Sequence, residues 1–315
     1  MMAMKFGDGR DWFLEKRFGM FVHWGLYAIN AWQEQEQQRL SIPRQEYEKL
    51  ISRFNPANFD PDAWIDLAQK AGMEYLTFTA KHLDGFCMWD TDQTDYKVTR
   101  SPYGKDVLAK VAEACHRRDF PLCIYYCLVD NHHPSYPISG KGHALKQPEP
   151  DDVPNLEKYL GYVRKQVREL CTDYGKIHGF WWDVNQLDHV DPSFNAMIRE
   201  LQPGVVINDR GFSEADFGTP ERDWVKSIDE DLEFDKLVEA CNSVGKESWG
   251  YRIDEDYFTT VHLMRGIANM FAKGGNYLLN VGPDADGVVP PQAVERLEKI
   301  GNWLGNVKEA LYGTA

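Results

Sequence analysis

The chain has 315 residues, 43% of them hydrophobic, which is enough for one large barrel or two ordinary domains. Its formal net charge of -14 argues against nucleic acid or an anionic membrane surface as a partner. No apolar run is as long as a membrane span and no secretory signal is visible, so we expect a cytoplasmic protein, or a secreted one whose leader was removed. The six cysteines form no C-x-x-C pair, which indicates reduced core thiols and no zinc site.

Extended and helical patterns alternate along the chain. Strand-like segments, apolar and rich in aromatic and β-branched residues, lie at 18–25, 73–82, 120–127, 175–186, 204–210, 247–251 and 276–281. Segments with helical spacing or helix start and stop signals lie at 43–54, 60–72, 105–118, 154–170, 192–201, 232–244, 259–272 and 291–304.

This alternation predicts an α/β protein with a parallel sheet covered by helices. At this length a (β/α)8-like TIM barrel is the favoured fold, and a doubly wound open sheet is the alternative. No G-x-G-x-x-G follows the first expected strand, which weakens a dinucleotide-binding fold. The barrel is expected to be irregular, because residues 211–233 show no clear period.

One expected strand ends on a lone carboxylate. Two indoles, Trp181 and Trp182, directly precede Asp183. Catalytic groups of α/β barrels lie at the carboxyl ends of the strands, and an acid beside aromatic rings suits a site that binds the face of a sugar. Alternatively, Asp183 caps the next helix or is a solvated loop acid.

Polar or aromatic side chains also end other expected strands. They are His23, His82, Tyr126, Arg210 and Trp249. Sugar hydroxyls need donors and acceptors, and the apolar sugar face needs aromatic area, so together these residues predict a monosaccharide pocket. Any single histidine here is more readily explained as a core residue bonded to backbone. A metal site built from His23, His82, His132 and His133 is disfavoured because no two of them form a helical i, i+4 pair, and we expect neither a metal nor a cofactor.

Hydrolysis of a glycosidic bond needs two carboxyl groups. Asp183 would be the first. The candidates for the second are Glu34, Asp84, Glu214, Asp216, Glu221 and Glu239. Chemistry alone does not choose among them.

Seven short blocks resemble the retaining α-L-fucosidases of glycoside hydrolase family 29, in the order of that family and over nearly the whole chain. The blocks are residues 18–27, 81–89, 181–183, 208–210, 216–221, 248–251 and 274–283. The resemblance implies an exo-α-L-fucosidase that releases terminal fucose from fucosylated oligosaccharides or glycoconjugates. Asp183 would be the nucleophile that forms a covalent glycosyl-enzyme, and Glu221 would be the general acid/base. The residues expected to hold sugar hydroxyls are His23, Glu34, His82, Tyr126 and Arg210, with Trp181 and Trp249 lining the pocket.

The chain departs from the family pattern at two places. Leu83 stands where the family usually has a second histidine, and Gln35-Glu36 stands where it commonly has aromatic residues. A sugar hydroxyl that loses its partner costs roughly 1–3 kcal/mol. The departures therefore leave open a retaining glycosidase for a related sugar, such as an α-L-galactoside, and a carbohydrate-binding protein with a crippled site.

The family often appends a C-terminal β-sandwich. The expected barrel already extends to the end of this chain, so we expect residues 1–315 to be a single catalytic barrel domain without the sandwich. Contacts on the aglycone side would then be absent or come from a neighbouring subunit of a homo-oligomer.

Overall fold

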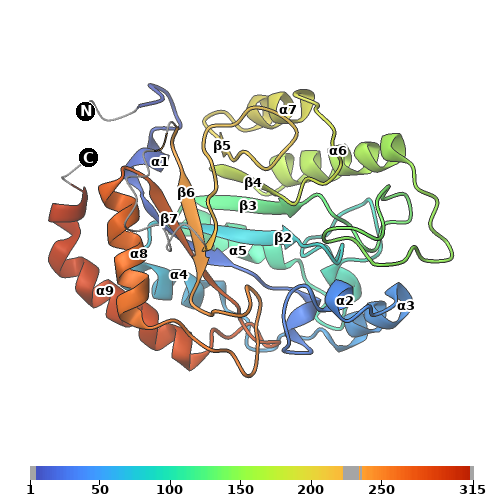
Figure 1. The fold of residues 1–315 in the computed structure, drawn as a ribbon, viewed down its shortest axis with the longest axis horizontal. Helices are drawn as coiled ribbons and strands as arrows, with labels where there is room; N and C mark the ends of the chain where they lie inside the picture. Colours follow the sequence, from blue (N-terminus) through green and yellow to red (C-terminus); the bar gives the residue numbers. More distant parts are fainter. Residues whose placement is uncertain (1–4, 223–233, 235, 313–315) are drawn as a thin grey trace.

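Seven parallel strands form one sheet in a computed structural model of the chain, which describes residues 5–222, 234 and 236–312 (Figure 1). They are β1 (Phe18–Val22), β2 (Tyr75–Lys81), β3 (Leu122–Cys127), β4 (Gly179–Asp183), β5 (Val206–Ile207), β6 (Glu239–Ser243) and β7 (Asn276–Val281). Their order in the sheet is β5-β4-β3-β2-β1-β7-β6. Every residue of β1, β2 and β3 is buried, as expected for parallel strands covered on both faces.

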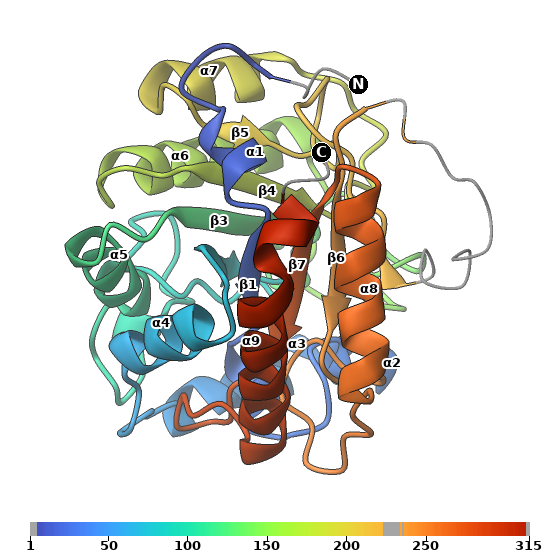
Figure 2. The ribbon, with the colours of Figure 1, turned by 90° about the vertical axis from the view of Figure 1, so that its left-hand side faces the viewer.

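Helices cover the outside of this sheet (Figure 2). The longer ones are α4 (Pro61–Lys70), α5 (Val107–Arg117), α6 (Leu156–Thr172), α7 (Ser193–Leu201), α8 (Thr260–Ala272) and α9 (Pro291–Tyr312). The short ones are α1 (Trp12–Glu15), α2 (Glu36–Arg39) and α3 (Arg44–Tyr47), with 3-10 turns at Leu26–Ala28, Glu48–Arg53 and Val98–Arg100. Four long helices begin on a side chain that accepts a backbone N–H of the first turn: Asp60, Asp106, Asn155 and Thr259.

The segment 216–221 joins the two edge strands of the sheet. On one side it pairs with the end of β5, where Asn208 and Phe217 form a parallel bridge. On the other side it pairs with β6, through a bridge between Glu221 and Cys241 and a hydrogen bond from the Glu239 N–H to the Gly218 carbonyl at 2.8 Å. The seven strands and this segment therefore form an irregular, barrel-like ring.

The predicted α/β fold with a parallel, helix-covered sheet is confirmed, but two predicted elements are wrong. Residues 239–243 form strand β6 instead of the helix expected over 232–244, of which residues 232, 233 and 235 lie outside the described residues. Glu239 lies inside the ring and Asn242 on the opposite face of the strand; both are buried polar residues, and in the sequence their i, i+3 spacing imitates the polar side of a helix. Residues 247–251, expected as a strand, form an irregular, bent segment.

All six cysteines are buried and free, in agreement with the prediction of core thiols. Across the described ranges, no helix combines the length and the apolar character that crossing a membrane requires.

Candidate active site

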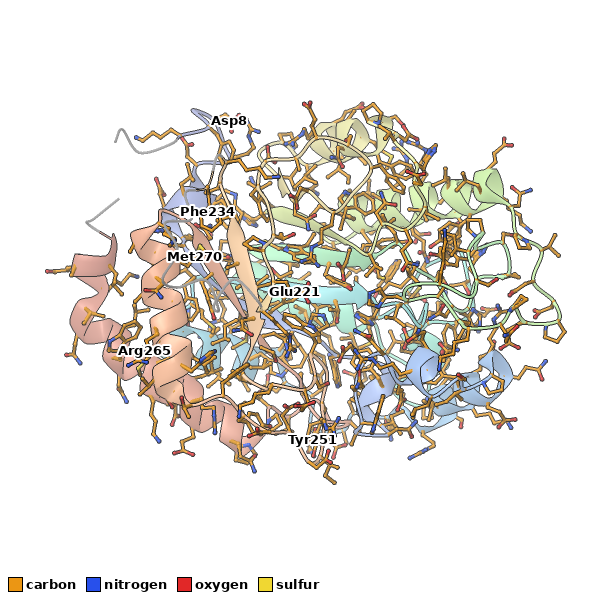
Figure 3. All side chains as sticks on the ribbon, in the orientation of Figure 1. Asp8, Glu221, Phe234, Tyr251, Arg265 and Met270 are labelled. Carbon is orange, nitrogen blue, oxygen red and sulfur yellow. The ribbon has the colours of Figure 1, made fainter. Side chains whose placement is uncertain are left out.

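A pocket opens at the carboxyl ends of the strands, and most of the predicted site residues meet there. Those that line it are His23, His82, Trp181, Asp183, Arg210, Glu221 and Trp249. It is also lined by Gln35 and Leu83, the two positions that depart from the family pattern, and by residues to which the sequence had assigned no role in the site: Phe21, Tyr125, His143, Val184 and Cys241. In Figure 3, Glu221 is labelled near the centre of the view.

Asp183 is the last residue of β4, and both of its carboxylate oxygens are held. The Tyr125 hydroxyl donates to Oδ2 at 2.6 Å, and Arg210 Nη1 donates to Oδ1 at 2.9 Å. Burial by itself would raise the pKa of Asp183, but the Arg210 charge and the hydrogen bonds from Tyr125 and Arg210 outweigh it and lower the pKa. Asp183 is therefore an ionised, oriented carboxylate, as a nucleophile must be.

The backbone turns sharply just after this carboxylate. Val184 has a φ of 50°, a left-handed conformation that is an outlier for a β-branched residue. Such strain concentrates at functional sites, where the surrounding structure holds it in place. Here the strained turn begins directly at the residue that follows Asp183.

Arg210 links the two candidate catalytic carboxyl groups. Its Nη2 lies 2.9 Å from Glu221 Oε2, while Nη1 of the same guanidinium bonds Asp183. Thr219 fixes the guanidinium further, accepting from Nε at 2.7 Å and from Nη2 at 2.9 Å. The guanidinium carbon lies 4.8 Å from the ring centroid of Trp181, a cation–π distance. One arginine thus brings together the acid at the end of β4 and the acid on segment 216–221.

Arg210→Gln is expected to shift the acid limb of the pH profile of kcat/KM to higher pH. If Asp183 is the nucleophile, its protonation abolishes activity, so a low pKa of Asp183 preserves activity toward low pH. Without the arginine charge, burial dominates and the pKa of Asp183 rises. The measurement is kcat/KM for an aryl α-L-fucoside from acid to neutral pH. Arg199→Gln, which removes an arginine paired with Asp216, is the control and should leave the limb in place; an unmoved limb in Arg210→Gln would contradict the prediction.

The two pocket histidines are uncharged at neutral pH. Burial and the neighbouring His82 lower the pKa of His23 to about 3, and burial lowers that of His82 to about 4. Asn280 Nδ2 donates to Ser243 Oγ and to the Trp249 carbonyl, so its Oδ1 accepts from His23 Nδ1 at 2.7 Å. This pairing assigns the proton of His23 to Nδ1 and leaves Nε2 as an acceptor.

The prediction that Tyr126 faces the sugar is wrong. Tyr126 points away from the pocket and donates to Gln166 at 2.7 Å. Its neighbour Tyr125 faces the pocket, because it lies beside Trp181 in the register of β3 and β4. Successive residues of a strand point to opposite faces, so Tyr125 and not Tyr126 shares the face of Trp181 and Asp183. Aligning the two strands by this parity would have identified Tyr125 from the sequence.

Tyr125→Phe is expected to lower kcat/KM for an aryl α-L-fucoside by roughly 10- to 100-fold, since a hydrogen bond to a charged group contributes about 1.5–3 kcal/mol. Tyr126→Phe is the matched control: it removes the bond to Gln166 and should lower the melting temperature while leaving kcat/KM near the wild-type value. Steady-state kinetics and thermal unfolding of both variants test this. Equal kinetic losses in the two variants would refute the assignment.

Glu34 lies behind the pocket wall rather than on it. It is 2% exposed, and its Oε2 accepts from Ser248 Oγ at 3.0 Å, the Trp249 N–H at 2.9 Å and the Gly250 N–H at 3.0 Å. Although burial opposes ionisation, the charge of His82 and the Gly250 N–H lower the pKa of Glu34. Glu34 therefore orders the turn that presents Trp249, which comes from a loop instead of the expected strand.

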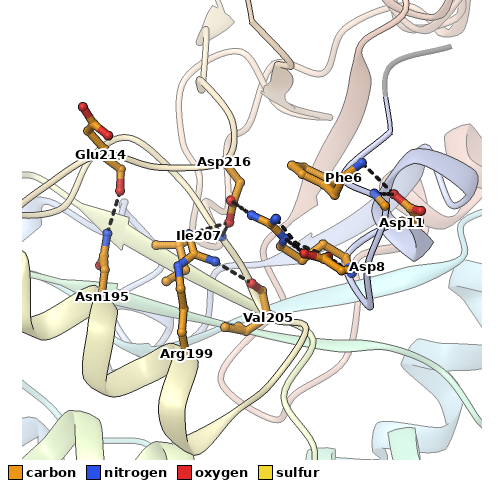
Figure 4. A network of polar contacts seen from close by, with 11 residues as sticks. Phe6, Asp8, Asp11, Asn195, Arg199, Val205, Ile207, Glu214 and Asp216 are labelled. Atoms are coloured by element: carbon orange, nitrogen blue, oxygen red, sulfur yellow. Dashed lines mark hydrogen bonds and ion pairs between the residues drawn. The ribbon is translucent and has the colours of Figure 1, made fainter. Parts of the chain in front are cut away.

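The other candidates for the second carboxyl group do not line the pocket. Asp216 is bound by Arg10 at 2.6 Å and Arg199 at 3.0 Å, in the network that Figure 4 shows. Glu239 is buried inside the ring, where it accepts from Tyr75 and from Trp181 Nε1. Asp84 is buried and accepts from the Tyr47 hydroxyl, and Glu214 is exposed. Among the described candidates, Glu221 alone joins Asp183 in the pocket lining.

The four histidines considered for a metal are divided between two places. His23 and His82 line the pocket, whereas His132 stacks on Tyr96 and lies 2.6 Å from Glu48. His133 packs on Tyr162. In the part of the chain that the structure describes, no group of three or more His, Cys, Asp or Glu side chains is arranged to hold a metal ion.

Comparisons with known proteins identify the family of the chain. The family model described as alpha-L-fucosidase matches residues 6–309. The tissue alpha-L-fucosidase of Rattus norvegicus is 28% identical over 96% of this chain and 70% of its own length. Among solved structures, alpha-L-fucosidase isoenzyme 1 from Paenibacillus thiaminolyticus is 36% identical, with a TM-score of 0.87 over 97% of this chain and 77% of that one.

Two further structures carry chemical information. An alpha-L-fucosidase from Lactobacillus casei in complex with the product alpha-L-fucose is 29% identical, with a TM-score of 0.83 over 96% of this chain and 99% of that one. A Bacteroides thetaiotaomicron enzyme of glycoside hydrolase family 29, trapped as a covalent intermediate, is 28% identical, with a TM-score of 0.82 over 95% of this chain and 75% of that one. The chain belongs to the α-L-fucosidase family of glycoside hydrolases.

Proposed function

We propose that this chain is a retaining exo-α-L-fucosidase that removes terminal α-L-fucosyl residues by double displacement. The observation that carries the proposal is the pair of carboxyl groups, Asp183 and Glu221, held by one guanidinium in a pocket walled by imidazole and indole rings. Retaining glycosidases place their two carboxyl groups close together, about 5–5.5 Å apart, because one of them attacks the sugar directly. A single arginine that contacts both supports this short spacing.

In the first step Asp183 attacks the anomeric carbon and forms a glycosyl ester. Glu221, protonated for this step, donates its proton to the glycosidic oxygen, and the aglycone leaves as an alcohol. In the second step Glu221 takes a proton from water, and the resulting oxygen nucleophile attacks the anomeric carbon. The ester bond breaks, fucose leaves with its original anomeric configuration, and Asp183 is again a carboxylate. Tyr125 and Arg210, which bind Asp183 in the free enzyme, stabilise its charge when it is released.

The walls of the pocket fit a deoxy sugar. The neutral His23 and His82 offer both donors and acceptors to hydroxyls, and the Nε2 of His23 is free to accept one. Trp181 and Trp249 supply aromatic area for the apolar face and the methyl group. A related Lactobacillus casei enzyme has been solved with Fuca(1,6)GlcNAc, so α1,6-linked fucosyl-N-acetylglucosamine is a first candidate among natural substrates for this chain.

We also propose that residues 1–315 act as a single catalytic domain with a (β/α)8-like barrel. The segment 216–221 would take the place of the eighth strand. Its bridges to Asn208 on one side and to Cys241 on the other support this assignment.

The test is time-resolved NMR of aryl α-L-fucoside hydrolysis, with an aryl α-L-galactoside compared in parallel. We expect α-L-fucose to form first and to mutarotate later, and the fucoside to be the faster substrate. Initial release of β-L-fucose would exclude retention. Faster turnover of the galactoside would instead identify a glycosidase for that sugar, and an absence of turnover on both would indicate a carbohydrate-binding protein.

A further inference from the structure

The wall of the pocket next to the end of β2 contains an apolar side chain, Leu83, and an imidazole that makes no described hydrogen bond, His143. Leu83, directly after His82, lines the pocket and is 1% exposed. His143 lines the same pocket, although it comes from the loop between β3 and α6, 60 residues further along the chain. Within the described ranges the His143 ring makes no hydrogen bond, and the Nδ1 of the buried His82 is also without a partner. Polar groups in such positions are available to a ligand.

One buried residue places His143 beside Leu83. The backbone N–H of Asn131 donates to the Leu83 carbonyl at 2.9 Å. The side-chain amide of Asn131 then donates to the His143 carbonyl at 3.3 Å and accepts the Leu145 N–H at 3.0 Å. The proximity of His143 to His82 is also evident electrostatically, because the charge of a protonated His143 lowers the pKa of His82.

A second set of hydrogen bonds holds the loop between β3 and α6, and it comes from the segment that follows Asp183. Gln186, three residues after the carboxylate, accepts the His143 N–H through Oε1 at 2.7 Å. Gly142 has a φ of 58°, and a Cβ at this position would overlap the Gln186 side chain. Gln38 of α2 donates to the Gly142 carbonyl at 3.1 Å. Asn131 and Gln186 therefore hold the backbone of His143 itself, and Gln38 holds that of Gly142 just before it, so the position of His143 is well defined.

The ring order of the strands identifies the part of the sugar that this wall faces. Counting around the ring, β2 and the segment 216–221 are four places apart in either direction, so the wall at His82 lies across the pocket from Glu221. Glu221 faces the glycosidic oxygen on the anomeric carbon. In a six-membered sugar ring, C4 lies opposite the anomeric carbon and C3 is next to C4.

We propose that His143 is a specificity-determining residue, and that its imidazole hydrogen-bonds the C3 or C4 hydroxyl of the terminal sugar, beside Leu83. This inference rests on the proposed function, since it takes Glu221 to mark the anomeric side. The loop between β3 and α6 is then part of the sugar site and supplies a polar group where Leu83 offers none.

The test combines variants of the loop with deoxy sugars. Calorimetric binding of L-fucose and steady-state kinetics on an aryl α-L-fucoside would compare wild type, His143→Ala, His143→Gln and Lys141→Ala, a control at an exposed residue of the same loop. We expect His143→Ala to weaken L-fucose binding by about 10- to 100-fold, with KM affected more than kcat. His143→Gln should lose less affinity for L-fucose, because an amide can still donate and accept hydrogen bonds. Lys141→Ala should bind and turn over substrate as the wild type does.

Deoxy sugars decide whether the contact is direct. With either 3-deoxy- or 4-deoxy-L-fucose, the difference in binding between wild type and His143→Ala should disappear. The proposal is overturned if the penalty of His143→Ala is the same for L-fucose and both deoxy sugars, or if it arises only with a disaccharide substrate, which would place His143 on the aglycone. Wild-type hydrolysis of the parent fucoside tests the proposed function separately, and the binding comparison does not depend on turnover.

Discussion

Asp183→Ala is expected to lower kcat for an aryl α-L-fucoside by about 10⁴- to 10⁶-fold, the range seen when a nucleophile or its close partner is removed from a catalytic group. The variant loses the carboxylate that we propose attacks the anomeric carbon, and no other described carboxylate lies in the pocket besides Glu221. Arg210 keeps Thr219 and Glu221 as partners, so the fold should persist. The value of kcat is measured in stopped and continuous assays of both proteins, and thermal unfolding checks that the variant is folded.

Addition of azide distinguishes the loss of the nucleophile from a general disruption of the active site in Asp183→Ala. In Asp183→Ala the small anion can enter the vacated space and attack the α-fucoside from the opposite face, so β-L-fucosyl azide should form and part of the activity should return. Asp188→Asn is the matched control: Asp188 is exposed on the same loop and has a φ of 47°, which asparagine tolerates. Wild-type turnover by Asp183→Ala, or inactivation by Asp188→Asn, would contradict the assignment.

Glu221→Ala is expected to show a loss that depends on the leaving group. For a fucosyl disaccharide, whose alcohol needs a proton to leave, kcat/KM should fall by about 10²- to 10⁴-fold. For a fucoside with an acidic phenol as leaving group, the first step should change much less, and the glycosyl-enzyme should accumulate because no base activates water. KM for that substrate should therefore fall, and an initial burst of phenol should appear.

Azide again gives a diagnostic product. In Glu221→Ala it attacks the accumulated glycosyl-enzyme and should give α-L-fucosyl azide, with the configuration opposite to the Asp183→Ala product. Glu214→Ala, at an exposed acid seven residues earlier, is the control and should match wild type. A uniform loss across all leaving groups would assign the proton transfer to another residue.

How much of this site the sequence could predict depends on the kind of segment that carries each residue. Asp183 was predictable, because a lone acid ends an apolar strand and its motif falls in order among the other family motifs. Tyr125 was missed in favour of Tyr126, because β3 is buried on both faces and its apolar pattern shows no alternation. Strand β6 was mistaken for a helix, because Glu239 is a buried carboxyl whose partners, Tyr75 and Trp181, come from distant strands.

His143 could not have been predicted to line the pocket. Its loop has no hydrophobic period, and its place depends on hydrogen bonds to Asn131, twelve residues away in the same loop, and to Gln186, which follows β4. Local patterns identify strands and helices, whereas such a residue is fixed by tertiary contacts that no short window contains.

Because the sheet is irregular between β5 and β6, it supports the two proposed catalytic carboxyl groups unequally. Asp183 is aligned by five consecutive register pairs between β3 and β4, and Glu221 by an isolated bridge to Cys241 and its bond to Arg210. The proposed nucleophile is therefore placed by a regular pair of strands, whereas the proposed proton donor lies on a segment that isolated bridges connect to β6 and to the end of β5. Engineering of residues 211–222 for new aglycones or for fucosyl transfer should keep Thr219, because Thr219 holds the guanidinium of Arg210 that binds Asp183.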